Sequence, residues 1–260
     1  MTGWFDAHNH LHDARLGDPV IMLAAMREAG VEHCVVNATC EADWPAVEAL
    51  ASGFPETVTP AFGIHPWKAD IVSEGWRERL AAILEKHPRA VIGECGLDRW
   101  VAAPSVEVQL PVFETQLDLA RETDRPVVIH CLKAWGHLID ALSAHPPPRF
   151  LMHSFNGSLE TARRLLPLGA WFSFSGHFLH ERKEAVREVF RELPRDRILV
   201  ETDAPDMLPP PANITHPLAE GINHPANLPA IGEALADLLE TDRDEFAALT
   251  RTNTLAWLNG

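Results

Sequence analysis

The sequence predicts an α/β protein built as a (β/α)8 barrel of the TIM type, with additional helices at its C-terminal end. Short apolar runs rich in β-branched residues recur eight times, and turn signals and helical patterns separate them. The chain has 260 residues, of which 46% are hydrophobic, which is enough for a full core. This length suits one barrel as well as two small domains, and we favour a single domain over residues 1–260.

The eight apolar runs predict eight parallel strands, joined through helices. The predicted strands lie at residues 4–8, 33–37, 58–63, 90–94, 126–130, 150–153, 170–173 and 198–201. The helical patterns lie near residues 19–30, 43–52, 74–87, 107–123, 134–144, 159–168 and 181–193. About two more helices are expected after Pro225, and these would close the chain.

The net charge of −15 argues against a protein that coats nucleic acid through general electrostatics, because phosphate binding usually leaves a basic surface. The only lysines are Lys68, Lys86, Lys133 and Lys183. An acidic chain can still act on a phosphate-bearing substrate if bound divalent ions supply the positive charge. Metals would therefore have to provide the attraction for such a substrate.

The chain shows neither an apolar run that could span a bilayer nor the basic and apolar segments of a signal peptide at its start. We therefore expect a cytoplasmic protein without a membrane partner. The four cysteines lie in or at the end of apolar runs and have no C-x-x-C spacing. Buried free thiols are predicted rather than disulfides or zinc-thiolate sites.

A histidine pair follows the first apolar run, in the segment Phe-Asp-Ala-His-Asn-His-Leu at residues 5–11. Side chains alternate faces along a strand, so His8 and His10 should point to the same side, and Asp6 is expected on that face too. Neutral imidazole is the commonest protein ligand for divalent transition metals. Two ligands need partners elsewhere in the fold, and without them this pair would be two surface histidines near a terminus.

Barrel enzymes carry their chemistry at the C-terminal ends of the strands, and potential metal ligands follow nearly every predicted strand here. These residues are His8 and His10, His65, Glu94, His130, His153, and Glu201 with Asp203. Each one alone fits a hydrogen-bonded histidine or a capping carboxylate. Gathered at one mouth, they would repel one another or lose hydration without cations, so a metal centre is predicted.

Six of these residues form a ligand set too large for one catalytic zinc with an open position. The set is His8, His10, Glu94, His130, His153 and Asp203. Two divalent ions per chain, with Glu94 as the shared ligand between them, are therefore predicted. An ion pair of Glu94 with an arginine across the barrel is the alternative, and the sequence leaves open whether the metal is Zn, Mg or Mn.

The sequence resembles the TatD family of metal-dependent hydrolases in ordered segments that run from residue 5 to Asn253 and Thr254. They are FDAHNHL at 5–11, GIHP at 63–66, GECGLD at 93–98, PVVIH at 126–130, HSFNGS at 153–158, SFSG at 173–176, ETDAP at 201–205 and PANLP at 225–229. The resemblance implies an amidohydrolase-type barrel, two divalent metals and deoxyribonuclease or related phosphodiesterase activity. It also implies that His8, His10 and Asp203 hold one ion, that His130 and His153 hold the other, and that Glu94 bridges them.

Hydrolysis by a metal-activated water fits both the residues and the resemblance. Coordination lowers the pKa of water from ~16 to ~7, and Asp203 is predicted to accept its proton and orient it. Asp203 and Glu94 are therefore the predicted catalytic residues. His65 is a candidate donor to a phosphate oxygen of the substrate, and the alternative is a structural contact with the backbone before Pro66.

The chain departs from the family pattern at positions that bear on the substrate. Family members often carry an arginine two residues after the histidine of strand five, whereas Leu132 stands there in this chain, and Lys133 could replace the arginine only if the turn rotates. Asn156 stands where the family has serine. Arg99 and Trp100 suit phosphate contact and base stacking, unless Trp100 packs on the rim and Arg99 is solvated. The loop at 205–224, with His216 and His224, is expected to cover the site.

We favour a two-metal nuclease that acts on single-stranded DNA or DNA ends, because a barrel mouth admits frayed nucleotides more easily than a duplex. The rival is a small-molecule amidohydrolase or lactonase with the same metal centre. Carbonyl hydrolases on this barrel often bridge their metals with a carboxylated lysine, whereas Glu94 stands at that position here. A barrel that only binds is disfavoured because all six ligands are present, and no obligate protein partner is evident.

Overall fold

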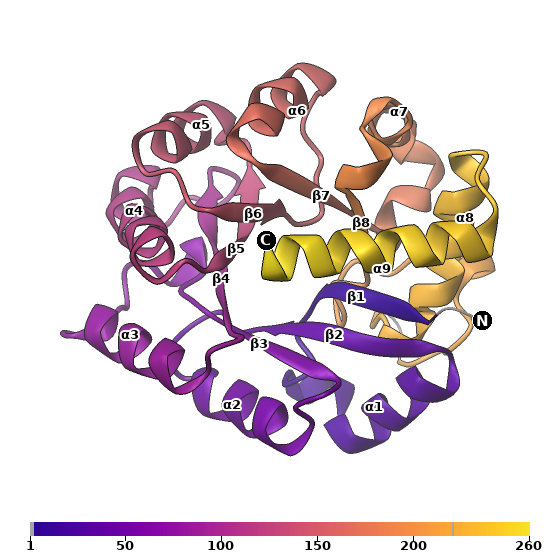
Figure 1. Cartoon of the computed structure of the whole chain (residues 1–260), viewed down its shortest axis with the longest axis horizontal. Helices are drawn as coiled ribbons and strands as arrows, with labels where there is room; N and C mark the ends of the chain where they lie inside the picture. Colours follow the sequence, from indigo (N-terminus) through magenta and orange to yellow (C-terminus); the bar gives the residue numbers. More distant parts are fainter. Residues whose placement is uncertain (1–2, 220) are drawn as a thin grey trace.

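The computed structural model describes residues 3–219 and 221–260, and its strands form one eight-stranded sheet in the order β1 to β8, with every pair parallel. The strands are β1 (Trp4–Asn9), β2 (Val31–Asn37), β3 (Val58–Phe62), β4 (Val91–Asp98), β5 (Pro126–Leu132), β6 (Arg149–Met152), β7 (Ala170–Ser175) and β8 (Ile198–Glu201). The sheet curves into a nearly closed barrel with the helices around it (Figure 1). The predicted barrel is confirmed.

The helices follow the predicted alternation, and the two C-terminal helices are present. They are α1 (Pro19–Glu28), α2 (Trp44–Gly53), α3 (Trp76–Lys86), α4 (Val106–Thr123), α5 (Trp135–Ala144), α6 (Leu159–Leu165), α7 (Glu184–Glu192), α8 (Leu228–Leu238) and α9 (Arg243–Asn259). Local sequence sets several of their starts, because a side-chain oxygen satisfies free backbone N–H groups there. Asp18 accepts from Val20 N before α1, and Ser158 accepts from Thr161 N before α6.

Strands β1 and β8 meet at their carboxyl ends and bring the first histidine pair beside Asp203. The Asp203 backbone N donates to His8 O at 2.9 Å, and His10 N donates to Ala204 O at 2.8 Å. Below them, the buried Asp6 carboxylate accepts hydrogen bonds from Thr202 N at 3.0 Å and from Thr202 Oγ1 at 2.6 Å. Asp6 therefore joins two strands.

The expectation that Asp6 shares a face with His8 and His10 is wrong. The pairing of β1 with β2 is irregular between Asp6 and Asn9, so strict alternation fails there. Ala7, between Asp6 and His8, belongs to the hydrophobic cluster inside the barrel. The local irregularity is what allows His8 to face the mouth while Ala7 packs below it.

Two apolar layers hold the barrel. The inner cluster consists of Ala7, Val35, Ala61, Val91, Val128, Leu151, Trp171, Leu199 and Trp257. A much larger outer cluster packs the strands against the surrounding helices. Helix α9 crosses the amino ends of the strands (Figure 1), where Asn253 Nδ2 donates to Ile198 O and Arg149 Nε donates to Trp257 O. Because α9 covers the amino ends of the strands, the carboxyl ends are the open end of the barrel at which a functional site can lie.

The predicted end of strand four is wrong. Strand β4 runs on to Asp98, so Glu94 lies within the strand rather than at its end, and the pairing with β5 is irregular between Ile92 and Cys95. The other predicted strands differ from the observed ones by a few residues at their ends. Glu94 still faces the barrel mouth, as its contacts with histidines of other strands show.

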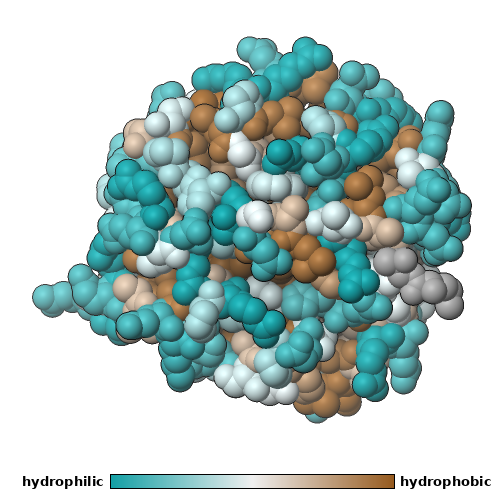
Figure 2. All heavy atoms as spheres, viewed as in Figure 1, coloured by the Kyte–Doolittle hydropathy of each residue, from teal (hydrophilic) through white to brown (hydrophobic). Residues whose placement is uncertain are grey.

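Among the described residues, no helix has the length and apolar character needed to cross a membrane. The face that α9 covers is mostly hydrophilic, with hydrophobic atoms in separate groups (Figure 2). All four cysteines are free thiols, and Cys34, Cys95 and Cys131 are buried while Cys40 is partly exposed. The predicted burial is therefore confirmed for three of the four thiols and is wrong for Cys40.

Candidate metal centre

A cavity of about 670 Å³ opens at the carboxyl end of the barrel. Five of the six predicted metal ligands line it, namely His10, Glu94, His130, His153 and Asp203. His8, the sixth, is fully buried, and its Nε2 lies within 3.5 Å of carboxylate oxygens of both Glu94 and Asp203. The structure therefore brings together side chains that are up to 195 positions apart in the sequence.

Glu94 lies among five histidines, with two imidazole nitrogens near its Oε2 and three near its Oε1, of which His65 Nε2 is one at 3.4 Å. Its Oε2 is 3.5 Å from His8 Nε2 and 3.4 Å from His10 Nε2. Its Oε1 is 2.9 Å from His153 Nε2 and 3.3 Å from His130 Nδ1. The carboxylate is 3% exposed, and its partners among the described residues are histidines rather than an arginine. Glu94 therefore belongs to two groups of side chains that could hold a metal ion, one with His8 and His10 and one with His65 and His130.

Asp203 lies beside the first histidine pair, His8 and His10. Its Oδ1 lies 3.3 Å from His8 Nε2 and 3.4 Å from His10 Nε2. The two histidine nitrogens are themselves 3.2 Å apart. Two imidazole nitrogens and two carboxylate oxygens thus surround one small space, from β1, β4 and the end of β8. A similar space lies between His130 Nδ1 and His153 Nε2, which are also 3.2 Å apart.

For two of the histidines, His10 and His130, a hydrogen bond on the far side of the ring determines which nitrogen faces these spaces. His10 Nδ1 donates to Asn37 O at 2.8 Å, since a carbonyl can only accept, and this leaves Nε2 free. His130 Nε2 donates to Asp98 Oδ2 at 3.0 Å, which leaves Nδ1 free. A metal-binding histidine typically donates its other N–H to a carboxylate or carbonyl in this way.

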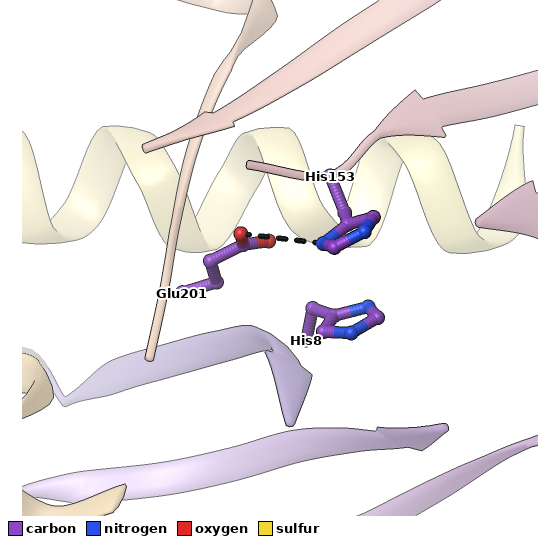
Figure 3. A group of neighbouring side chains, drawn as sticks. All are labelled: His8, His153 and Glu201. Carbon is purple, nitrogen blue, oxygen red and sulfur yellow. Dashed lines mark ion pairs between the residues drawn. The ribbon is translucent and has the colours of Figure 1, made fainter. Parts of the chain in front are cut away.

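Glu201 stands behind His153. Figure 3 shows the two side chains pointing toward each other, with the His8 ring beside that of His153. His153 Nδ1 is 3.6 Å from Glu201 Oε1, and the two rings stack with centroids 4.1 Å apart. Both Glu201 oxygens already accept hydrogen bonds, from Ser154 N and from Ser173 Oγ. Glu201 therefore lies behind His153 at a distance longer than a hydrogen bond, and its negative charge, together with that of Glu94, raises the pKa of His153 against the effect of burial.

The pKa shifts in this cluster show how its buried carboxylates are compensated when no metal ion is bound. Burial opposes ionisation of Glu94, yet the charges of His153, His65 and His8 hold its pKa well below the ordinary value. Burial also opposes protonation of His10, but the hydrogen bond to Asp203 and the charge of Glu94 raise its pKa to about 9. Protonated imidazoles thus compensate the buried carboxylates when no other cation is present.

Divalent cations fit this donor set. With Nδ1 of His10 donating to a carbonyl, its Nε2 lone pair faces His8 Nε2 and two carboxylate oxygens across distances of 3.2 to 3.4 Å. Lone pairs and anions that converge in a buried site repel one another unless a proton or a cation lies among them. Imidazole and carboxylate ligands suit Zn, Mn and related divalent ions. The residues present therefore fit a metal.

His65 lies next to this cluster and makes the backbone contact that the sequence offered as an alternative. Its Nδ1 accepts from Trp67 N at 3.2 Å, so the ring proton is on Nε2. That Nε2 lies 3.4 Å from Glu94 Oε1 and lines the cavity. Burial lowers the pKa of His65 to about 4, so the ring is neutral, and its single N–H faces Glu94 Oε1 at the edge of the cavity.

The other predicted substrate contacts are not brought to the cavity. Arg99, Trp100 and Lys133 are absent from its lining, and Lys133 Nζ lies 3.9 Å from the centre of the Trp100 ring. Lys133 is therefore directed to Trp100, and its role as a substitute for the family arginine stays a prediction. Leu132 does line the cavity, at the place of that arginine.

The long loop at 205–224 contributes fewer residues to the cavity wall than expected. Residue 220 lies outside the described residues. Asp206 and Met207 line the cavity, whereas His216 and His224 do not and instead pack together with ring centroids 5.3 Å apart. Of the described residues of this loop, only those at its start therefore belong to the wall of the cavity.

Two residues that matter for the site were missed in the sequence. Asp98 accepts a hydrogen bond from His130, and Trp67 lies in the cavity wall. The spacing offered a signal for Asp98, since it follows Glu94 by four positions. The cationic residues of the lining, Arg15, Lys68 and Lys183, come from separate loops, and no local pattern identifies them.

Comparison with known proteins agrees with this geometry. The family model described as TatD related DNase matches residues 5–259. The uncharacterized metal-dependent hydrolase YjjV of Escherichia coli (strain K12) is 32% identical over 260 residues, which cover 98% of each chain. Its crystal structure superposes with a TM-score of 0.90, covering 99% of this chain and 98% of that one.

A second relative carries a more specific name. The 3′-5′ ssDNA/RNA exonuclease TatD of Erwinia tasmaniensis is 32% identical over 245 residues, which cover 93% of each chain. The resemblance noted in the sequence is thereby confirmed. Because the family match spans almost the whole chain, this protein belongs to the TatD-related DNase family and is a metal-dependent hydrolase.

Proposed function

We propose that this protein is a two-metal phosphodiesterase that removes nucleotides from the ends of single-stranded DNA. The observation that carries the proposal is the position of Glu94, whose two oxygens face different imidazoles: Oε2 faces His8 and His10, and Oε1 faces His130 and His153 with His65 beside them. Two-metal sites are a common solution for phosphodiester hydrolysis. The relative from Erwinia tasmaniensis, named as a single-strand exonuclease, supports the choice of substrate.

In this proposal His8, His10 and Asp203 hold one divalent ion, His130 and His153 hold the other, and Glu94 is shared. The ions supply Lewis acidity, which acidifies a water molecule and offsets the negative charge of a phosphate. The chain fixes the ligands before substrate arrives, through Asn37 O behind His10 and Asp98 behind His130. Little reorganisation is then needed during the reaction.

Asp203 is the proposed proton acceptor. It is buried at the end of β8, and hydrogen bonds from His10 and His8 outweigh burial and hold its pKa below the ordinary value, so it is anionic at neutral pH. An anionic carboxylate beside a nucleophilic water can accept its proton and fix its orientation. His65, neutral and with its proton on Nε2, is the proposed donor to a phosphate oxygen.

The cavity suits one end of a strand better than a duplex. Its volume of about 670 Å³ is that of a small-molecule site, which has room for one or two nucleotides. Its lining contains five carboxylates, Asp13, Asp43, Glu94, Asp203 and Asp206, against three cationic residues, Arg15, Lys68 and Lys183. An anionic strand therefore depends on the bound ions for its attraction to the site.

The experiment that tests the proposal is a time course with end-labelled oligonucleotides and metal-loaded protein. Single-stranded DNA labelled at the 5′ end should shorten in steps from its 3′ end, and blunt duplex DNA of the same sequence should react more slowly. An acyl ester and a lactone serve as competing substrates. Hydrolysis of those compounds without cleavage of DNA would replace this proposal with the small-molecule hydrolase.

A further inference from the structure

Trp67 is the large aromatic side chain of the cavity wall that is most open to solvent. It belongs to the 3-10 turn Pro66–Lys68 that follows β3, and half of its surface, 50%, is exposed. A tryptophan usually buries most of its large apolar surface, because exposure of that surface to water is unfavourable. An indole left open in the wall of a substrate cavity is therefore suited to cover an apolar surface of a ligand.

The ring is held rigidly although it is exposed. Trp67 Nε1 donates to Asp98 Oδ2 at 2.7 Å, and Trp67 N donates to His65 Nδ1 at 3.2 Å. Asp98 is fully buried, and it also accepts from His130 Nε2. Both the backbone and the indole are thus tied to residues of the candidate metal centre. A surface fixed before binding loses little conformational entropy when a ligand stacks on it.

The position of the ring matches one nucleotide bound at the centre. Its centroid lies 5.0 Å from that of His65 and 6.4 Å from that of His130. A phosphate at the ions would therefore place its own sugar and base near the indole. Lys68, the next residue, also lines the cavity, and among the described residues it forms no salt bridge.

We infer that Trp67 is the base-stacking residue of this cavity, so that the enzyme recognises a nucleotide through its base as well as through its phosphate. The inference rests on the proposed nuclease function and deepens it, since stacking on an aromatic ring tolerates any base and suits a nuclease without sequence preference. Trp100, which the sequence analysis named for this role, lies outside the lining of the cavity.

The test compares two ligands that differ only in the base. Metal-loaded wild type is titrated by calorimetry with 2′-deoxyadenosine 5′-monophosphate and with 2-deoxyribose 5-phosphate. Stacking on an aromatic side chain should favour the nucleotide by about fivefold or more in affinity. Trp67→Leu should abolish this preference and leave the affinity for the sugar phosphate within about twofold, whereas Trp67→Phe, which keeps an aromatic face, should retain most of the preference.

Two controls separate stacking from damage to the centre. Elemental analysis of each variant reports whether loss of the Trp67–Asp98 hydrogen bond has lowered the metal content, and a purely structural defect would weaken both ligands alike. Trp100→Leu tests the rival position. The inference is overturned if Trp67→Leu retains the preference for the nucleotide, or if Trp100→Leu alone loses it. In either case the proposed function stands as long as wild type cleaves the oligonucleotide. Absence of both nucleotide binding and DNA cleavage in wild type would overturn the two together.

Discussion

Two histidines of the candidate centre, His10 and His130, have a hydrogen-bond partner on the far side of the ring. Asp98 accepts from His130 Nε2, and Asn37 O accepts from His10 Nδ1, so the opposite nitrogen is free in each case. A carboxylate behind an imidazole also makes the ring more basic and fixes its orientation. Asp98 is thus a positioning residue that acts through His130.

Asp98→Asn should lower metal affinity by about 10- to 100-fold without unfolding the protein, because an amide is a weaker acceptor for the His130 N–H. The measurement is a titration of metal-free protein with Mn²⁺, together with a thermal melt. A matched control is Asp118→Asn, which changes an Asp–His contact of 3.0 Å with His145, a pair outside the cavity lining. Equal metal affinities of the two variants would show that Asp98 has no role in positioning.

Glu94→Gln should lower metal content and hydrolysis together, by about 100-fold or more in rate, since the shared negative charge offsets the repulsion between two cations. Elemental analysis and oligonucleotide cleavage on the same sample provide the measurement. Glu41→Gln, which changes a surface carboxylate paired with Arg79, is the control and should behave as wild type. A fully loaded Glu94→Gln enzyme with normal activity would show that Glu94 is only structural.

At the scale of strands and loops, the features that follow from hydrophobic periodicity were predicted correctly. The apolar runs identified all eight strands, and parallel pairing then brought their carboxyl ends, with the histidines, to one edge. Where the register is irregular, periodicity failed. Asp6 was predicted on the wrong face of its strand, and strand four was predicted to end at Glu94 although β4 continues to Asp98. A bulge depends on packing against neighbouring strands, which no local pattern encodes.

Loops were harder to interpret than strands. Trp67 and Trp100 both lie in loops near the mouth and are 50% and 68% exposed, yet only Trp67 lines the cavity. The difference comes from distant partners. Asp98 fixes the indole of Trp67, whereas Trp100 is paired with Lys133. Tertiary contacts between loops determine these positions, so composition alone does not predict which of the two tryptophans lines the cavity.

The carboxyl end of β5 offers a direct gain-of-function test. Leu132 lines the cavity at the position where the resemblance to the family implies an arginine, and Leu132→Arg should raise the affinity for a non-cleavable single-stranded oligonucleotide severalfold. The salt dependence of binding should steepen by about one phosphate contact. Leu255→Arg, on helix α9, adds the same charge at an exposed position outside the cavity lining and should change neither quantity. No gain from Leu132→Arg would mean that no phosphate lies there.

At the scale of the whole molecule, charge and protonation link the centre to pH. The chain carries a net charge of −15, and the buried carboxylates of the centre raise the pKa of His10 to about 9 and that of His153 well above its usual range. In metal-free protein these imidazoles hold protons at neutral pH. The raised pKa of His10 contributes stability that is fully present below its ordinary value of 6.5 and is lost as the pH rises through about 9.

Metal binding should therefore release protons. Between pH 6.5 and about 9, the affinity of metal-free protein for Mn²⁺ should rise, by about tenfold per pH unit for each proton displaced, and then level off. Calorimetry at pH 7 in buffers of different ionisation enthalpy counts the protons, and His10→Asn should release fewer. Affinity independent of pH across this range would contradict the assignment of His10 as a ligand that must lose a proton.

The claim that two ions act together is tested most directly by an activity titration. Metal-free protein at a concentration well above the dissociation constants receives Mn²⁺ in small steps, and cleavage of a single-stranded oligonucleotide is measured after each step. Activity should rise until two equivalents per chain are bound and then stay constant, as expected when Glu94 is shared by two ions. Full activity at one equivalent, or cleavage by the metal-free protein, would contradict it.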